Sequence, residues 1–231
     1  MQSKDPAGLD TSAVTEWVFD LDNTIYPAKS SLFPRVAARM TSWIMAHFDL
    51  PEDEAAALKT RLFRQYGTTM HGLMHEYGLP SEDFLAYVHE IDLSDVSPDA
   101  MLDKALGKLK GRKHIYTNGT VRHAERILEA FGIRHHFDYI YDIVAAQHMP
   151  KPDMRPYHDF IARAGINPKQ AVMIEDMARN LEPAAALGMQ TVWLMADESW
   201  AKAGSDEAYV HFIARDVKHL LTCLTQVEDA A

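Results

Sequence analysis

The alternation of apolar segments in the second half of the sequence restricts the fold more than any other feature. After residue 111, short runs rich in Val, Ile and aromatic residues, typical of buried strands, alternate with longer segments of helical spacing. This alternation predicts a parallel sheet covered by helices on both faces, because parallel strands are usually joined by a crossover helix. The predicted strands are 114–117, 139–144, 171–174 and 191–194, and the predicted helices are 121–131, 154–164, 178–187 and 216–226.

A further strand is predicted at 17–19, and a block of helical sequence separates it from the rest of the sheet. Residues 31–90 have helical spacing throughout, with helix breaks at Gly67 and Gly78. We therefore predict an α/β fold, a doubly wound parallel sheet with a helical cap domain inserted after the first strand, where the cap would exclude water from the strand end. The predicted catalytic core is 1–27 plus 97–231, and the predicted cap is 28–96.

Composition excludes several classes of function. Cys223 is the single cysteine of the 231 residues, which excludes a disulfide framework and a cysteine-based zinc site. A net charge of −10 argues against nucleic-acid binding and provides no polybasic membrane patch. No apolar run approaches the roughly 20 residues of a membrane-spanning helix, and residues 1–15 lack the apolar core of a secretory signal. We therefore expect a soluble cytoplasmic protein whose first dozen residues are loosely ordered.

Two aspartates directly follow the first predicted strand. Asp20 and Asp22 are two residues apart, and side chains at that spacing point the same way along an extended chain. They would then reach one site at the carboxyl end of the strand, where open α/β sheets bind ligands. Close carboxylates repel each other, and a divalent cation such as Mg²⁺ would offset that repulsion. Taken alone, however, both residues are equally typical of an ordinary turn.

Polar groups also follow two later segments. Thr117 ends a predicted strand, and Asn118 and Gly119 separate it from the next helix, where a hydroxyl, an amide and free N–H groups suit a phosphate. A simple helix cap uses the same residue types, and it is the favoured interpretation of this segment alone. Lys151 lies between two prolines that hold it in a stiff, extended segment. A lone lysine is most often a solvated surface group, so the prolines raise its interest only somewhat.

A second acidic cluster follows the strand predicted at 171–174. Glu175 and Asp176 come directly after this strand, and Asn180 follows Asp176 by four residues. Acids near the start of a helix are expected from the helix dipole, which accounts for Asp176. The dipole does not explain why a second acidic cluster would face the first.

The order of these motifs is more specific than any one of them. The chain contains Asp-x-Asp-x-Thr, a strand ending in Thr-Asn, then Lys-Pro, and then Glu-Asp-x-x-x-Asn. In this order it resembles the haloacid dehalogenase (HAD) superfamily of phosphohydrolases, from about residue 17 to residue 195 and including the position of the cap. The family fold implied is a doubly wound parallel sheet with a helical cap inserted after the first strand.

The resemblance implies a metal-dependent mechanism with an aspartyl-phosphate intermediate. Asp20 would be the nucleophile, and Asp22 would be the general acid for the leaving alcohol and then the base that activates water. Mg²⁺ would be bound by Asp20, by the backbone carbonyl of Asp22 and by Asp176. Asn180 would support the metal or its waters, and Glu175 would help to orient or neutralise the site.

The resemblance also assigns the phosphate-binding groups. Thr117, Asn118 and Gly119 would bind phosphoryl oxygens, and Lys151 would pair with Asp20 and with the phosphoryl charge. Charge counting agrees with this assignment, because the four acids and a dianionic substrate exceed the three positive charges of Mg²⁺ and Lys151. A protonated Asp22 and backbone N–H groups would close most of that difference.

Three short segments, one in the predicted core and two in the predicted cap, narrow the expected substrate. Segments 20–27, 66–73 and 87–89 resemble the pyrimidine 5′-nucleotidase branch of the superfamily, which implies hydrolysis of UMP- or CMP-like monophosphates. The candidates for contacts to the nucleoside are Tyr66, Thr68, Thr69 and His71. The expected partner is therefore a small phosphorylated metabolite, with neither a nucleic-acid polymer nor a membrane as partner.

Other interpretations stay open at this point. Sugar phosphates, phosphoglycolate or pyridoxal phosphate are alternative substrates, and a non-catalytic HAD-like binding module is a less favoured alternative. A dehalogenase would need neither Asp22 nor the second acidic cluster, and a mutase is less common. His71 is followed by a second histidine at i+4, but no third metal ligand is evident. The pair His135 and His136 is expected to be a loop feature with no role.

Overall fold

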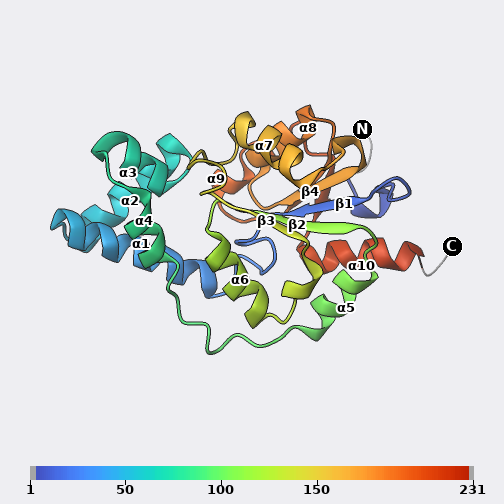
Figure 1. Ribbon diagram of the computed structural model, residues 1–231, viewed down its shortest axis with the longest axis horizontal. Helices are drawn as coiled ribbons and strands as arrows, with labels where there is room; N and C mark the ends of the chain where they lie inside the picture. The colour runs from blue at the N-terminus through green and yellow to red at the C-terminus, as the bar shows by residue number, and fades with distance from the viewer. Residues whose placement is uncertain (1–3, 229–231) are drawn as a thin grey trace.

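The computed structural model describes residues 4–228 and contains a single six-stranded sheet (Figure 1). All neighbouring strands are parallel, in the order β3-β2-β1-β4-β5-β6. The predicted α/β fold with a doubly wound parallel sheet is therefore confirmed. The strands are β1 Glu16–Phe19, β2 Arg112–Tyr116, β3 Tyr139–Tyr141, β4 Ala171–Glu175, β5 Gln190–Leu194 and β6 Phe212–Ala214.

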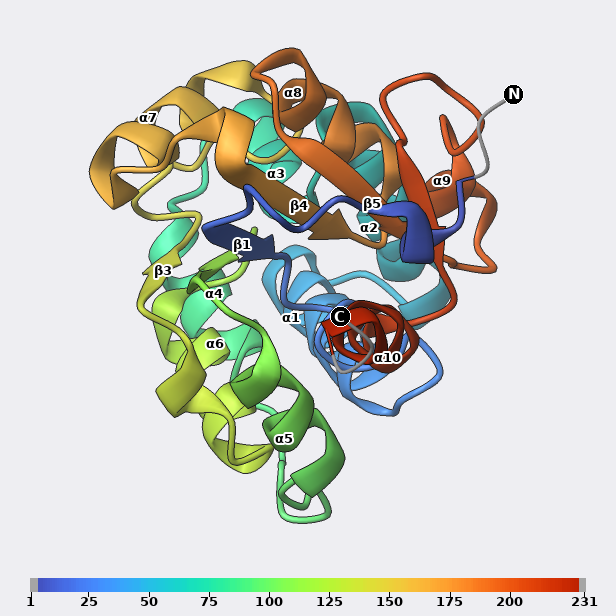
Figure 2. The same cartoon turned by 90° about the vertical axis from the view of Figure 1, so that its right-hand side faces the viewer.

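The helices form two layers against the sheet and a separate group at one end of it. Helices α7 and α8 cover one face, and α5, α6 and α10 cover the other (Figure 2). The short α9 follows β5, and α1–α4 gather at the left of Figure 1, opposite the two termini. The helices are α1 Leu32–Phe48, α2 Glu52–Tyr66, α3 Thr69–Tyr77, α4 Ser81–Val88, α5 Ala100–Lys108, α6 Val121–Ala130, α7 Met154–Ala164, α8 Leu181–Ala186, α9 Ser199–Lys202 and α10 Val217–Glu228.

Alternate residues of the central strand pack into two separate cores. Trp17 and Phe19 belong to the core beneath α5, α6 and α10, whereas Val18 belongs to the core beneath α7 and α8. This arrangement follows from the period of two along a strand, and it explains why β1 is buried at every position and is apolar from Trp17 to Phe19. The strand that delivers Asp20 is therefore held rigidly between two packed layers.

The helix boundaries follow the capping signals of the sequence. The Asp99 side chain accepts a hydrogen bond from the backbone N–H of Leu102 and begins α5, an N-cap position that Asp favours. Thr120 caps α6 in the same way through the N–H of His123. Gly78, with a φ of +64°, ends α3 in the left-handed conformation that glycine adopts most easily.

Several sequence expectations were wrong in detail. The strand predicted at 139–144 ends at Tyr141, and the helix predicted at 178–187 begins as a 3₁₀ turn, Ala178–Asn180, before α8. Strand β6 and helix α9 were not predicted. Both are too short to have a recognisable period, so tertiary pairing rather than local sequence decides them.

The expectation of a loosely ordered N-terminus was also wrong for the residues that the structure describes. Residues Pro6–Gly8 form a 3₁₀ turn against α10 and β6, and Leu9 is buried. The backbone carbonyl of Lys4 accepts a hydrogen bond of 2.7 Å from the N–H of Ile213 in β6. The expectation overlooked that a few apolar residues suffice to dock an otherwise polar segment. Residues 1–3 lie outside the described part.

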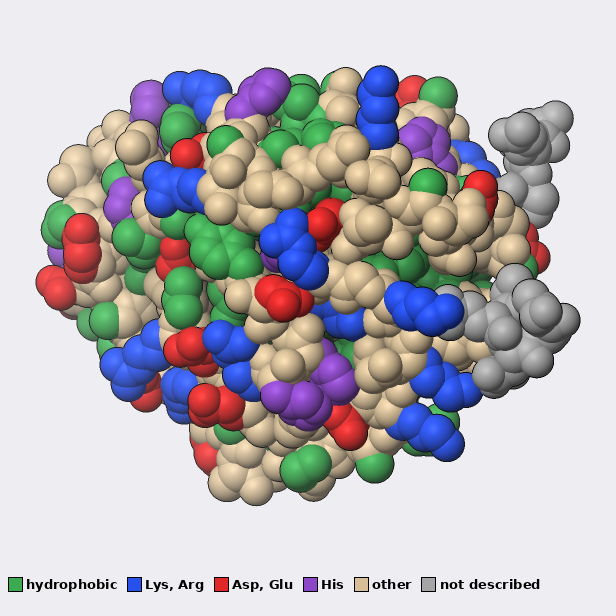
Figure 3. Space-filling model, turned by 45° about the vertical axis from the view of Figure 1, so that its right-hand side comes forward, with side chains coloured by type: hydrophobic (Ala, Val, Ile, Leu, Met, Phe, Trp, Pro, Cys, Tyr) green, Lys and Arg blue, Asp and Glu red, His purple; other side chains and the backbone are tan. Residues whose placement is uncertain are grey.

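Two further observations concern the molecule as a whole. Within residues 4–228, no helix combines the length and apolarity that crossing a bilayer requires. On the face drawn in Figure 3, acidic and basic side chains are interspersed, so the net charge of −10 is not expressed there as one acidic surface. The boundaries of the predicted cap, residues 28–96, stay a prediction, although α1–α4 all fall within them.

Candidate active site

Three central strands end side by side and bring the polar motifs together. The strand register aligns Phe19 of β1 with Ile115 of β2 and with Ile174 of β4. Asp20 therefore lies next to the carboxyl ends of both neighbours, which is the ligand-binding position of an open α/β sheet. Thr117 follows β2 by one residue, and Glu175 is the last residue of β4.

Lys151 occupies the centre of this group and is almost completely buried. Its ammonium lies 2.6 Å from Asp20 Oδ1 and 2.8 Å from Glu175 Oε1, and it donates to the Tyr116 carbonyl at 2.9 Å. The side chain of Asn118 accepts a hydrogen bond of 2.9 Å from the backbone N–H of Lys151. Lys151 is thus a positioned internal cation, and a solvated surface lysine is excluded.

The carboxylates of Asp20, Glu175 and Asp176 form a buried acidic cluster around this single ammonium. One oxygen from each lies within 4.8 Å of the others. Burial raises the pKa of Asp20 to about 7 against the opposing effect of Lys151. Burial and the neighbouring Glu175 raise the pKa of Asp176 well above its usual range. Three carboxyl groups thus share one ammonium, and a further positive charge would favour their ionised forms.

Glu175 differs from the other two acids because N–H donors already satisfy it. Its Oε1 accepts from Asn180 Nδ2 at 2.6 Å as well as pairing with Lys151, and its Oε2 accepts from the backbone N–H of Met177 at 2.7 Å. Burial alone would raise the pKa of Glu175, but Lys151 and these hydrogen bonds outweigh it and hold the pKa below its usual value. Glu175 therefore orients Lys151 and Asn180.

The acidic cluster fits a hard divalent cation. Asp20 and Asp176 supply carboxylate oxygens, which Mg²⁺ prefers, and a cation would balance their excess negative charge. The side-chain oxygen of Asn180 is buried and has no hydrogen-bond partner within the described residues. Such an oxygen can accept from a metal-bound water, since buried polar atoms are normally paired.

Asp22 has partners that the sequence reasoning missed. The Tyr26 hydroxyl donates to Asp22 Oδ1, and His123 Nε2 lies 3.0 Å from the same oxygen. The ring of His123 stacks on His89 at a centroid distance of 4.4 Å. Burial alone would raise the pKa of Asp22, but His123 and Tyr26 outweigh it and lower the pKa. A histidine in the first turn of the helix after the Thr-Asn motif was the signal that could have indicated this contact.

The chain enters a tight turn directly after Asp20. The N–H of Ile25 bonds to the carbonyl of Leu21 at 3.0 Å, and Asn23 has a left-handed φ of +62°. The extended geometry expected through Asp22 is therefore absent, and the tight turn instead places Asp22 beside α6. Asp20 and Asp22 nevertheless line the same cavity.

Thr117, Asn118 and Gly119 also line this cavity, but they are not all free to bind a ligand. The Thr117 hydroxyl oxygen accepts a hydrogen bond of 2.8 Å from the N–H of Gly119, so the hydroxyl hydrogen is left to donate. The Asn118 oxygen is already engaged with Lys151. The loop therefore serves both to hold the lysine and to face the cavity.

The cavity has a volume of about 280 Å³ and extends from the acidic cluster into the group α1–α4. Among the sequence candidates for substrate contacts, Thr68 and Thr69 line it, whereas Tyr66 and His71 are outside the lining. His71 Nδ1 instead lies 3.1 Å from the carbonyl of His148, and Tyr66 packs against His75. The apolar wall, which the sequence did not indicate, includes Phe33, Val36, Met40, Phe63, Phe84 and Trp200.

Comparison with known proteins assigns the family. The family described as "haloacid dehalogenase-like hydrolase" matches residues 18–188, which is well over half of the chain and includes every motif above. The chain therefore belongs to the haloacid dehalogenase-like hydrolases.

Two curated relatives are distant. The protein is 27% identical over 189 residues to "Phosphate metabolism protein 8" of Saccharomyces cerevisiae, covering 74% of this chain and 58% of that protein. It is 30% identical over 166 residues to "Haloacid dehalogenase-like hydrolase domain-containing protein 3" of Bos taurus, covering 68% of this chain and 66% of that protein. The chain thus spans less than two thirds of the length of either relative.

Solved structures agree on the fold. A HAD phosphatase from Thermococcus onnurineus superposes with a TM-score of 0.62 at 16% identity, covering 93% of this chain and 98% of that one. The HAD-hydrolase YfnB of Bacillus subtilis, solved bound to magnesium, gives 0.55 at 17% identity, covering 93% and 98%. At these identities the likeness concerns the fold alone.

Proposed function

We propose that this hydrolase is an Mg²⁺-dependent phosphomonoesterase that acts through an aspartyl-phosphate on Asp20. The observation that carries the proposal is the buried group of Asp20, Lys151, Glu175 and Asp176 at the carboxyl end of the sheet. Asp20 is paired with the Lys151 ammonium, and the neighbouring Asp176 has no such cationic partner among the described residues. This arrangement suits a phosphoryl group together with a divalent cation. A halide displacement requires no such second acid.

In the first step, one oxygen of Asp20 attacks phosphorus, and the bond between phosphorus and the leaving alkoxide breaks. Lys151 holds the other oxygen through its contact with Oδ1, which fixes the carboxylate for attack. Thr117 can donate its free hydroxyl hydrogen to a phosphoryl oxygen. Mg²⁺, held by Asp20, the carbonyl oxygen of Asp22 and Asp176, would supply charge neutralisation for the phosphoryl group.

Asp22 then exchanges protons with the leaving group and with water. As general acid it gives a proton to the departing alcohol, and as base it removes one from the water that hydrolyses the aspartyl-phosphate. His123 and Tyr26 favour the carboxylate form before substrate binds. The nearby phosphoryl charge would favour the protonated form that the first step needs.

We further propose that the substrate is a pyrimidine nucleoside monophosphate. The cavity next to Asp20 is lined by apolar and aromatic side chains, which suit a flat base, and by the hydroxyl-bearing Thr68 and Thr69. Sugar phosphates, phosphoglycolate and pyridoxal phosphate are the competing substrates. A purely polar sugar phosphate makes less use of an apolar wall.

The first prediction tests the reaction and the substrate together. Phosphate release is measured with Mg²⁺ for UMP, CMP, a sugar phosphate, phosphoglycolate and pyridoxal phosphate, and chloride release is measured for a 2-haloacid. We expect UMP and CMP to be the best substrates, with activity lost in Asp20→Asn and after treatment with EDTA. Steady turnover by Asp20→Asn, or full activity without metal, would refute the mechanism. A preference for another ester would refute only the nucleotide assignment.

A further inference from the structure

A second cluster of potential metal ligands lies far from the acidic cluster. It consists of Asp103 on α5 and of His135 and His136 in the 3₁₀ turn Arg134–His136, which precedes β3. The turn and the start of β3 are at the amino edge of the sheet, whereas Asp20 lies at the carboxyl edge. In Figure 1, α5 and the group α1–α4 lie at opposite ends of the molecule. The sequence interpretation of His135 and His136 as a loop pair without a role did not foresee this contact.

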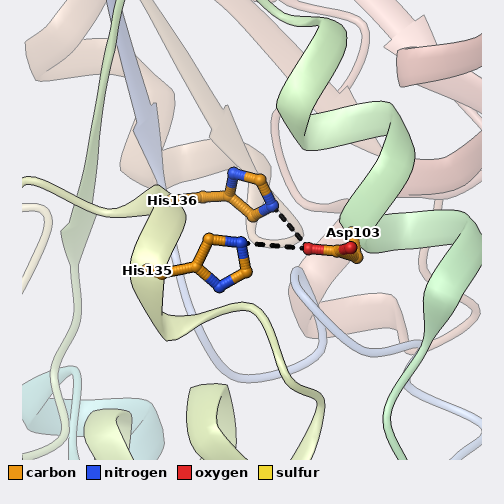
Figure 4. A group of neighbouring side chains, drawn as sticks. All are labelled: Asp103, His135 and His136. Carbon is orange, nitrogen blue, oxygen red and sulfur yellow. Dashed lines mark hydrogen bonds and ion pairs between the residues drawn. The ribbon is translucent and has the colours of Figure 1, made fainter.

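Both imidazoles point at one carboxylate oxygen (Figure 4). The distance from Asp103 Oδ1 is 3.2 Å to His135 Nε2 and 2.7 Å to His136 Nε2, and the two ring centroids are 4.1 Å apart. One ligand atom from each side chain lies within 4.8 Å of the others. For tetrahedral Zn²⁺, with bonds of about 2.0–2.2 Å, ligand atoms lie about 3.3–3.5 Å apart. The contact of His135 with Asp103 is already close to that spacing, and the contact of His136 would have to lengthen by about 0.6–0.8 Å to admit the ion.

The cluster combines a held ligand with two accessible ones. The side chain of His136 is 13% exposed, and its ring lies beside Gly107, one turn after Asp103 on the same face of α5. The side chains of His135 and Asp103 are 65% and 43% exposed, so solvent reaches the site directly. The neighbouring cation, Arg134, is directed elsewhere, to the carbonyl of Phe137 and to Glu125. Within the turn Arg134–His136, therefore, only the two imidazoles contact Asp103.

We propose that Asp103, His135 and His136 form a binding site for a transition-metal cation such as Zn²⁺, separate from the phosphoryl site. Two imidazole nitrogens and one carboxylate oxygen are the ligand set that zinc takes, and they are poorer ligands for Mg²⁺, which prefers oxygen alone. Each imidazole offers the Nε2 lone pair in the neutral tautomer that carries its proton on Nδ1, so protons compete with the cation for this nitrogen. Water completes the coordination of the ion. The bound cation ties α5 to the turn that precedes β3.

The test is calorimetric titration of the whole protein with Zn²⁺ in the presence of excess Mg²⁺. We expect His135→Gln, His136→Gln and Asp103→Asn each to raise the dissociation constant of one site by about tenfold or more, because each removes a ligand. His158→Gln is the matched control, since His158 is an exposed histidine of α7 outside the cluster. It should leave the affinity unchanged. Electron paramagnetic resonance with Cu²⁺ should show nitrogen ligands in the wild type that weaken in both histidine variants.

Equal Zn²⁺ affinity and stoichiometry in the wild type and in all three variants would overturn the proposal. His135→Gln keeps the test valid even if Asp103→Asn fails to fold, because the His135 side chain is mostly exposed. The phosphatase activity gives no readout of this site, so failure here leaves the proposed function untouched. Conversely, an inactive wild-type enzyme that still binds Zn²⁺ at this cluster would refute the proposed function alone.

Discussion

At the scale of single residues, Lys151 is the group on which the buried charges of the site depend. It is the ammonium that contacts both Asp20 and Glu175, and all three side chains are almost fully buried. Burial alone would lower the pKa of Lys151, but the two carboxylates outweigh it and raise the pKa. The lysine therefore carries its positive charge at neutral pH.

Replacing Lys151 should destabilise the fold when no metal is present. For Lys151→Met we expect the free energy of unfolding to fall by about 3–5 kcal/mol, because carboxylates stay buried without their partner. Mg²⁺ should restore more stability to this variant than to the wild type. Urea unfolding with and without Mg²⁺ measures both effects. Lys218→Met is the control, because the pair of Lys218 with Asp99 is half-exposed and contributes about 0–1 kcal/mol; an equal loss in both variants would contradict the argument.

His123 is a positioning residue for Asp22. Its Nε2 lies 3.0 Å from Asp22 Oδ1, and its ring is held by stacking on His89. We expect His123→Ala to lower kcat by about 10²-fold with little change in KM, because a misplaced acid–base group loses most of its effect. His123→Asn, which can still donate a hydrogen bond, should recover part of the activity. A change confined to KM would contradict this role.

At the scale of elements, the end of α4 is joined to the core through a buried histidine. His89 follows α4 directly and shares a hydrogen bond of 3.1 Å with the hydroxyl of Thr120, the residue that caps α6. Burial and the neighbouring His123 lower the pKa of His89 to about 3. The folded protein therefore keeps this imidazole neutral at pH values where the unfolded chain protonates it.

This difference predicts that acid loosens the junction. Because the unfolded state binds the proton first, the contribution of His89 to stability is present above its ordinary pKa of 6.5 and is lost as the pH falls toward 3. Denaturation measured from neutral to acid pH should show a shallower loss of stability in His89→Gln than in the wild type. Parallel curves for the two proteins would show that another group causes the acid sensitivity.

Sequence alone predicted where the polar motifs gather, because strand topology determines their position. Once β1, β2 and β4 are recognised as parallel strands, Asp20, Thr117 and Glu175 must meet at one edge of the sheet. The contact between Asp22 and His123 could not be derived in this way, since it depends on the turn after β1 and on the rotation of α6. The lining of the cavity by helix faces, which excludes Tyr66 and His71, depends on tertiary packing in the same way.

At the scale of the whole molecule, the group α1–α4 and the core meet across the cavity through aromatic side chains. Phe63 of α2 packs edge-to-face on Trp200 of α9 at a centroid distance of 5.1 Å, and the guanidinium of Arg179 lies over Phe63. Phe63 and Trp200 both line the cavity. Under the proposed function, this contact between two distant parts of the chain would limit the size of the substrate's organic group.

Trp200→Ala tests this arrangement. We expect KM for UMP or CMP to rise about tenfold, which corresponds to the loss of about 1.4 kcal/mol of binding, because an aromatic wall is removed. The KM for phosphoglycolate, which is too small to reach the wall, should change much less. Equal changes for large and small esters would mean that Trp200 supports the fold and not the substrate.

The N-terminal segment covers part of one edge of the sheet, far from any question of catalysis. Strand β6 is the last strand on its side of the sheet, and the exposed backbone of such an edge is a template on which a strand of another molecule can pair. The carbonyl of Lys4 occupies the N–H of Ile213 on that edge, and Leu9 anchors the segment in the core beneath α10. The segment from Lys4 to Leu9 thus covers part of the β6 edge, which disfavours pairing of this edge with a strand of another molecule.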